Sequence, residues 1–290
     1  MKILVTGGTG FTGSYVVPRL LREGTQVRCL VRATSITRGL PLDQIELVEG
    51  DFAATASLDR AFDGCSALVN IASLGFGDAP AIVDAAVRAG IRRAVFVSTT
   101  AIFTTLDASS KAVRLAAEDA VRRSGLGYTI LRPTMIYGSA RDRNICRLIR
   151  YLRRWRVIPV FGSGQYLQQP VYVEDVADAI VQSLFSERAA GKVYNLPGGT
   201  PLTYNQIIDA LCGLLRRRVC KIHLPAQAVA GSLALLEKLP LPVPLRREQV
   251  LRLNEHKAFS FAEAAEDFGY SARSFADGAT QELRALGLMA

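Results

Sequence analysis

The chain has 290 residues, 49% of them hydrophobic, enough to bury a core in one large α/β domain or in two unequal ones. Its five cysteines form no C-x-x-C pair and it has two histidines, which excludes a metal site of recognised spacing. The formal charge of +9 predicts anionic partners. No signal peptide or membrane-spanning stretch is visible, so we expect a cytoplasmic protein with reduced thiols.

The first predicted elements are a strand at 2–6, a glycine-rich turn and a helix at 14–23. Glycine lets the backbone approach a ligand closely, and the unpaired N–H groups at a helix N-terminus favour an anion. This context predicts a site for the pyrophosphate of a dinucleotide. The residues expected to form it are Gly7, Thr9, Gly10, Phe11, Thr12 and Gly13.

The next two strands, at 26–31 and 45–49, predict how the adenosine half is recognised. An acidic residue after the second strand would bond the 2′-hydroxyl of NAD, but Arg32 stands there. Because a guanidinium can form two hydrogen bonds to a 2′-phosphate, we expect the cofactor to be NADP, with NAD as second choice. The alternative is that Arg32 is a solvated loop cation. After the third strand, Asp51 is expected to bond the adenine amino group, with Phe52 beside it.

Strands and helices then alternate along the chain. Strands are predicted at 67–71, 93–98 and 127–132, helices at 56–63, 79–89 and 109–124, and further sheet-like pieces at 171–173 and 193–195 around a helix at 174–186. The pattern predicts an α/β fold: a Rossmann-type doubly wound parallel sheet with a smaller, mostly helical C-terminal substrate lobe. We assign 1–138 plus 169–197 to the dinucleotide-binding domain and 139–168 plus 198–290 to the lobe. The substrate crevice is expected between them.

Several motifs occur in an order that resembles the extended short-chain dehydrogenases/reductases, of the NAD-dependent epimerase/dehydratase type. They are the glycine pattern, Gly50-Asp-Phe52, Phe96-Val-Ser-Thr-Thr100, Lys111, Leu131-Arg-Pro-Thr-Met-Ile-Tyr-Gly138 and Gln169-Pro-Val-Tyr-Val-Glu-Asp175. The resemblance implies nicotinamide chemistry, in many members on nucleotide sugars. It also includes members that bind NAD(P) without turning it over.

The resemblance implies a catalytic Ser/Thr, matched by Thr100, and a Tyr four residues before a Lys on one helix. Lys111 matches the lysine, but Asp107 stands where the tyrosine is expected. A carboxyl is already ionised at neutral pH, so Asp107 can act as a base but is a poor proton donor; it also suits a helix N-cap. Tyr137, expected to face the crevice, is the candidate replacement phenol, with packing as its alternative role.

Other positions are implied more weakly. Ala72 and Ser73 are expected near the nicotinamide ribose, and the backbone of Pro133 to Met135 near the carboxamide. Gln168 stands where many relatives carry an arginine that holds substrate phosphate. Arg143, Arg147 and Arg246 are candidates to replace that arginine.

Three functions therefore remain open. The leading one is reduction or epimerisation at a keto or hydroxyl carbon of a nucleotide-linked sugar. The others are a non-catalytic NAD(P)-binding sensor or assembly factor, and a keto-reductase on a lipid or quinone, consistent with the apolar stretch 226–245. The arginines between 141 and 156 suit a phosphate patch, an anionic membrane surface or a solvated face; no nucleic-acid module is recognised. A homodimer and peripheral membrane contact are left open.

Overall fold

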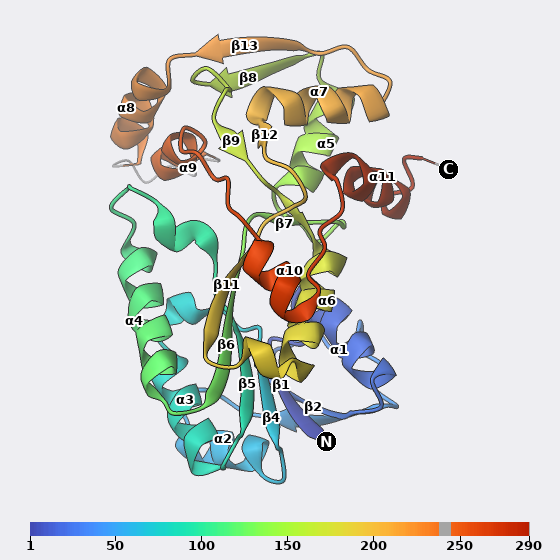
Figure 1. The fold of residues 1–290 in the computed structure, drawn as a ribbon. Coiled ribbons are helices and arrows are strands. Elements are labelled where there is room, and N and C mark those ends of the chain that lie inside the picture. Colours follow the sequence, from blue (N-terminus) through green and yellow to red (C-terminus); the bar gives the residue numbers. More distant parts are fainter. Residues whose placement is uncertain (238–244, 290) are drawn as a thin grey trace.

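A seven-stranded parallel sheet forms the centre of the protein in a computed structural model that describes residues 1–237 and 245–289 (Figure 1). The strand order is β11-β6-β5-β4-β1-β2-β3. Its strands are β1 (Lys2–Thr6), β2 (Gln26–Val31), β3 (Ile45–Glu49), β4 (Ala67–Asn70), β5 (Arg93–Val97), β6 (Gly127–Pro133) and β11 (Lys192–Leu196). The order reverses between β1 and β4, so the sheet is doubly wound and has its crevice at that switch point.

Helices cover both faces of this sheet. Helices α1 (Gly13–Arg22) and α6 (Val173–Phe185) pack together on one face. The opposite face carries α2 (Thr55–Phe62), α3 (Ala79–Arg88) and α4 (Ser109–Arg123), with the 3-10 turns η1 (Leu74–Phe76) and η2 (Thr100–Phe103). The short η3 (Glu187–Ala189) follows α6.

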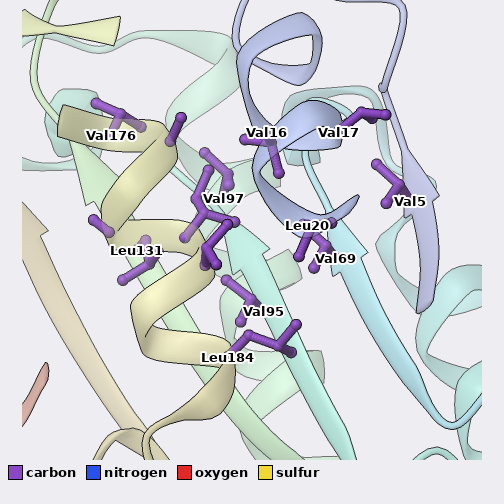
Figure 2. Close-up of a cluster of buried hydrophobic side chains, with 14 of the residues drawn as sticks. Val5, Val16, Val17, Leu20, Val69, Val95, Val97, Leu131, Val176 and Leu184 are labelled. Carbon is purple, nitrogen blue, oxygen red and sulfur yellow. The ribbon is translucent and has the colours of Figure 1, made fainter. Parts of the chain in front are cut away.

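Two apolar cores follow from the alternation of side chains along each strand. Ile3 and Val5 of β1 face the α1/α6 side, whereas Leu4 faces the α2/α3/α4 side. The first core joins Val16 and Leu20 of α1 to the middle strands, as Figure 2 shows. Strands buried on both faces are continuous apolar runs, which is why the sequence shows them so clearly.

A smaller lobe lies beyond the carboxyl edge of the sheet and has its own core (Figure 1). Its helices are α5 (Ile145–Arg154), α7 (Tyr204–Leu214), α8 (Ala226–Leu236), α9 (Arg247–Arg252) and α11 (Phe275–Ala285). Its strand pairs are β13 (Cys220–Leu224) with β8 (Val157–Phe161), and β12 (Leu202–Thr203) with β9 (Leu167–Gln168). The pair β10 (Val171–Tyr172) and β7 (Ile136–Tyr137) joins the two parts.

The predicted fold class is confirmed, with two differences in detail. Residues 171–172 pair with β7 and not with the large sheet. Helix α10 (Ala262–Phe268), which we expected in the lobe, packs against β11 and α6, because Ala264 and Tyr270 belong to the first core. Residues 238–244 of the apolar stretch lie outside the described residues. No described helix has the length and apolar character needed to span a bilayer.

Candidate functional site

The glycine turn between β1 and α1 is folded so tightly that side chains are excluded from it. Gly7 has a φ of +72°, and a Cβ there would lie 2.7 Å from the Ala72 nitrogen. A Cβ on Gly13 would lie 2.2 Å from the Gly7 carbonyl oxygen. No side chain caps the N-terminus of α1, whose positive dipole end faces the turn; the Ser14 and Tyr15 N–H groups donate to the Gly10 and Thr12 carbonyl oxygens. This is the cradle that the pyrophosphate of a dinucleotide fits.

Arg141 lies over this turn, a contact that the sequence analysis missed. Its guanidinium donates to the Thr9 carbonyl oxygen at 2.6 Å and to Ser14 Oγ at 3.3 Å. Ser14 Oγ in turn donates to the Phe11 carbonyl oxygen. The contact brings a cation from the lobe to the glycine turn. No local sequence motif predicts this contact, because 127 residues separate Arg141 from Ser14.

The residues expected at the adenosine end follow strands on the same side of the switch point. Arg32 is exposed just after β2, and its backbone N–H donates to Ser35 Oγ. Asp51 is exposed after β3, and one of its carboxylate oxygens accepts from the Ala53 N–H at 3.0 Å. Phe52 packs against the second core. The carboxyl ends of β2 and β3 therefore carry an exposed guanidinium and an exposed carboxylate.

A cleft of about 240 Å³ opens at the carboxyl end of β4, β5 and β6. Its lining residues are Thr12, Ile71, Ser73, Leu74, Val97, Ser98, Thr99, Arg114, Pro133, Thr134 and Ile136. The sequence predicts Ser73 and Pro133 near the nicotinamide, and Thr12 in the pyrophosphate site. The Met135 side chain packs against the core of the lobe, and its carbonyl oxygen accepts from the Val171 N–H at 3.0 Å. The cleft lies beside the glycine turn and at the carboxyl ends of the strands, which is where open α/β sheets bind their ligands.

Of the predicted and observed α4 side chains, Arg114 lines this cleft, whereas Asp107 and Lys111 do not. Arg114 lines the cleft, and its Nη1 donates to Ser110 Oγ at 2.8 Å. A Cβ on Gly75 would lie 3.1 Å from Arg114 Nε, so the side chain is held between α4 and η1. Burial lowers the pKa of Arg114, yet a guanidinium remains protonated at neutral pH.

The residues expected to carry the catalysis lie elsewhere. Thr100 is buried, and its hydroxyl donates to the Pro133 carbonyl oxygen at 3.4 Å; its neighbour Thr99 lines the cleft. Lys111 Nζ donates to the Thr104 carbonyl oxygen at 2.6 Å and so ties down the turn before α4. Asp107 is exposed and is not the N-cap, since Ala108 occupies that position.

Tyr137 does not face the crevice as expected. Its side chain is 1% exposed in the core of the lobe, between the rings of Tyr172 and Phe275. Its hydroxyl donates to the Phe275 carbonyl oxygen at 3.3 Å, and burial raises its pKa far above the ordinary value. Its role is packing, which was the alternative.

The candidate substrate residues are not brought together at the cleft. Gln168 is buried, donating to the Glu255 carbonyl oxygen and accepting from Lys257 Nζ, so it holds the segment before α10. Arg143, Arg147 and Arg246 are exposed, and none of the three lines the cleft.

A buried ion pair supports the floor of the cleft. Glu118 of α4 is 1% exposed; it accepts from Ser98 Oγ at 2.6 Å and from Arg132 Nε at 2.9 Å. Arg132 also lies over the Phe103 ring. The network fixes α4, the end of β5 and β6 relative to one another, and with them Thr99 and Arg114.

Comparison with known proteins supports this assignment of the fold and the turn. A family model described as NAD(P)H-binding matches residues 7–187. The chain therefore belongs to the NAD(P)H-binding family, and its resemblance to the extended short-chain dehydrogenases/reductases is confirmed. A nicotinamide dinucleotide is the cofactor class of this family.

Two relatives and one solved structure place the chain within this class. It is 28% identical over 279 residues to NADH dehydrogenase [ubiquinone] 1 alpha subcomplex subunit 9 of Arabidopsis thaliana, covering 88% of this chain and 69% of that protein. It is 30% identical over 190 residues to ceramide reductase of Caulobacter vibrioides, covering 62% and 59%. The fold matches UDP-glucose 4-epimerase of Thermotoga maritima with a TM-score of 0.77, at 18% identity and 99% coverage of both chains.

Proposed function

We propose that this chain binds NADP(H), and NAD(H) less tightly, as a resident ligand and does not turn it over. When bound, the nicotinamide would supply a hydride, but a carbonyl that accepts a hydride also needs a proton. The observation that carries the proposal is Arg114, which lines the cleft and donates to Ser110 Oγ.

The chemistry of Arg114 and Ser110 favours binding of a dinucleotide over transfer of a proton. A guanidinium offers several donors to ribose hydroxyls but does not give up a proton at neutral pH, and a serine hydroxyl is a far weaker acid than a phenol. Among the described residues that line the cleft there is no tyrosine, histidine, aspartate or glutamate. The name of the Arabidopsis relative, a subunit of a larger complex, is consistent with a binding role.

Titration of the purified chain with NADPH and NADH, followed by nicotinamide fluorescence, tests the binding. We expect micromolar affinity, weakened about tenfold by Arg114→Ala because charged hydrogen bonds are lost. The matched control is Arg123→Ala on the same helix, which removes an exposed guanidinium paired with Asp119 and leaves the affinity unchanged. Failure of both dinucleotides to bind would refute the proposal.

Absorbance at 340 nm tests the absence of turnover, with UDP-glucose, dTDP-glucose, a long-chain ketone and a quinone as substrates. We expect no change with any of them. Reaction of the apolar ketones would support the second candidate, a keto-reductase on a lipid or quinone, which the apolar side chains of Ile71, Leu74 and Val97 in the cleft favour. Reaction of the sugar nucleotides would support the activity implied by the family resemblance. Either result contradicts the proposal.

A further inference from the structure

The outer end of the lobe carries a sheet face with exposed apolar side chains. Strands β8 and β13 are parallel, with Val157 opposite Cys220, Pro159 opposite Ile222, and Phe161 opposite Leu224. Directly paired residues share a face of a sheet, and the alternate residues Ile158 and Val160 are buried in the lobe core. The six paired residues therefore form the outer face, which we call the lobe strip.

The lobe strip is open to solvent at its centre and at one end. Val157 is 44% exposed and Ile222 is 48% exposed. Trp155, which directly precedes β8, is 52% exposed, with the Arg154 guanidinium over its ring at 5.4 Å from the centroid. The opposite face of β13 is occupied, since Lys221 pairs with Asp209 of α7. Figure 1 shows both strands at the end of the molecule remote from the large sheet.

A basic ridge borders the strip where both strands begin. The strands are parallel, and the Cys220 N–H donates to the Arg156 carbonyl oxygen at 2.8 Å, so the residues before β8 and before β13 meet at one edge. The ridge consists of Arg153, Arg154, Arg156, Arg216, Arg217 and Arg218. Within the described part of the chain, none of the six forms an ion pair with a carboxylate. The segment 139–168 has seven arginines and one acidic residue, so this charge is not compensated locally.

We propose that the lobe strip and its basic ridge bind the surface of an anionic lipid membrane. Apolar and tryptophan side chains enter the headgroup boundary while flanking arginines reach phosphate groups, and each basic residue near such a surface strengthens binding about fivefold. A nucleic acid would pair with the arginines but would leave Val157 and Ile222 in water. The combination of both features at one edge favours the membrane.

Trp155 is the one tryptophan of the chain, so its fluorescence reports on the proposed contact directly. The full chain is titrated with phosphatidylcholine vesicles containing about one third phosphatidylglycerol, with and without bromine atoms on the acyl chains. We expect a blue shift of the emission, quenching by the brominated lipid, and loss of binding in 0.5 M salt because the attraction is screened. Pure phosphatidylcholine vesicles should bind at least tenfold more weakly.

Two variants separate the charge from the apolar contact. Arg154→Glu with Arg156→Glu should weaken vesicle binding at least tenfold, whereas Arg22→Glu with Arg92→Glu, exposed residues of the large domain with the same charge change, should not. Ile222→Asn keeps the charge but should reduce quenching by brominated lipid. Equal weakening by both charge pairs, binding without quenching, or tighter binding to a short RNA than to the vesicles would overturn the proposal.

Discussion

Glu282 is a carboxyl group inside the core of the lobe, and it makes the stability of the protein depend on pH. It is 0% exposed, no N–H or hydroxyl group donates to its oxygens, and its polar neighbour is the Asp142 carboxylate, to which the protonated carboxyl can donate. Burial and the neighbouring Asp142 raise its pKa to about 8, only partly offset by Arg150. The folded state therefore retains a proton that the unfolded state loses above its ordinary pKa near 4.5.

The sign of the effect follows from this difference. Because the folded state binds more protons between about pH 5 and pH 8, the free energy of unfolding falls as the pH rises through that range. Glu282→Gln removes this part of the slope and should be more stable than the parent at pH 8. Denaturant unfolding at pH 5 to 9 measures the free energy of unfolding of both proteins, and the exposed Glu49→Gln serves as the control. A slope unchanged in Glu282→Gln would mean that the carboxyl is ionised in the folded state.

In the proposed function, the preference for NADP over NAD depends on Arg32. We expect Arg32→Asp to weaken NADPH binding at least tenfold and to strengthen NADH binding, since a carboxylate repels the 2′-phosphate and accepts from the 2′-hydroxyl. Arg38→Asp makes the same charge change on an exposed arginine of the following loop and should shift both affinities little. Equal losses in the two variants would show a general charge effect instead.

At the element scale, the buried carboxylate of Glu118 joins helix α4 to the sheet, beside the apolar contacts of Ala117 and Val121. Glu118→Ala leaves Arg132, 13% exposed, without its partner and should lower the free energy of unfolding by about 3 kcal/mol. The adjacent Asp119→Ala removes an exposed pair with Arg123 and should cost less than about 1 kcal/mol. Urea denaturation of the two variants compares them, and equal losses would contradict a special role for Glu118.

The strands of the large sheet could be predicted from the sequence almost to the residue, because buried parallel strands are short apolar runs between polar turns. The face of α4 that meets the cleft could not be predicted. Lys111 was chosen as the one lysine between Lys2 and Lys192, but the rotation of a helix is set by its buried residues. Ala117 and Val121 of α4 are buried. Arg114 lies three residues before Ala117 and seven before Val121, which are spacings that place it on the same face of the helix.

The lobe was less predictable for a similar reason. Strand β8 contains Pro159, which does not suit a central strand, and β13 gains its regularity only from pairing with β8 across more than fifty residues. The contact of Arg141 with the glycine turn is also tertiary. Patterns of local hydrophobicity contain no information about such pairings.

For the molecule as a whole, dinucleotide binding should stabilise the folded state. A ligand at about 100 times its Kd adds about 2.7 kcal/mol. For a chain of this size that corresponds to a rise in Tm of about 5 °C. Differential scanning calorimetry with NADPH measures it, and glucose 6-phosphate at the same concentration controls for anion binding by a basic protein. An equal rise with the sugar phosphate would assign the effect to charge alone.

The distribution of thiols across the molecule has a practical consequence. All five cysteines lie in the described residues; four are buried, and burial raises the pKa of Cys29, behind the glycine turn, to about 12. Cys220 is exposed at the start of β13. Because thiolate formation and access govern alkylation, a maleimide dye should attach at this one position in the unmodified chain. A dye on Cys220 would thus mark the outer end of the lobe without any substitution. Its distance to a fluorescent dinucleotide could then be measured by energy transfer.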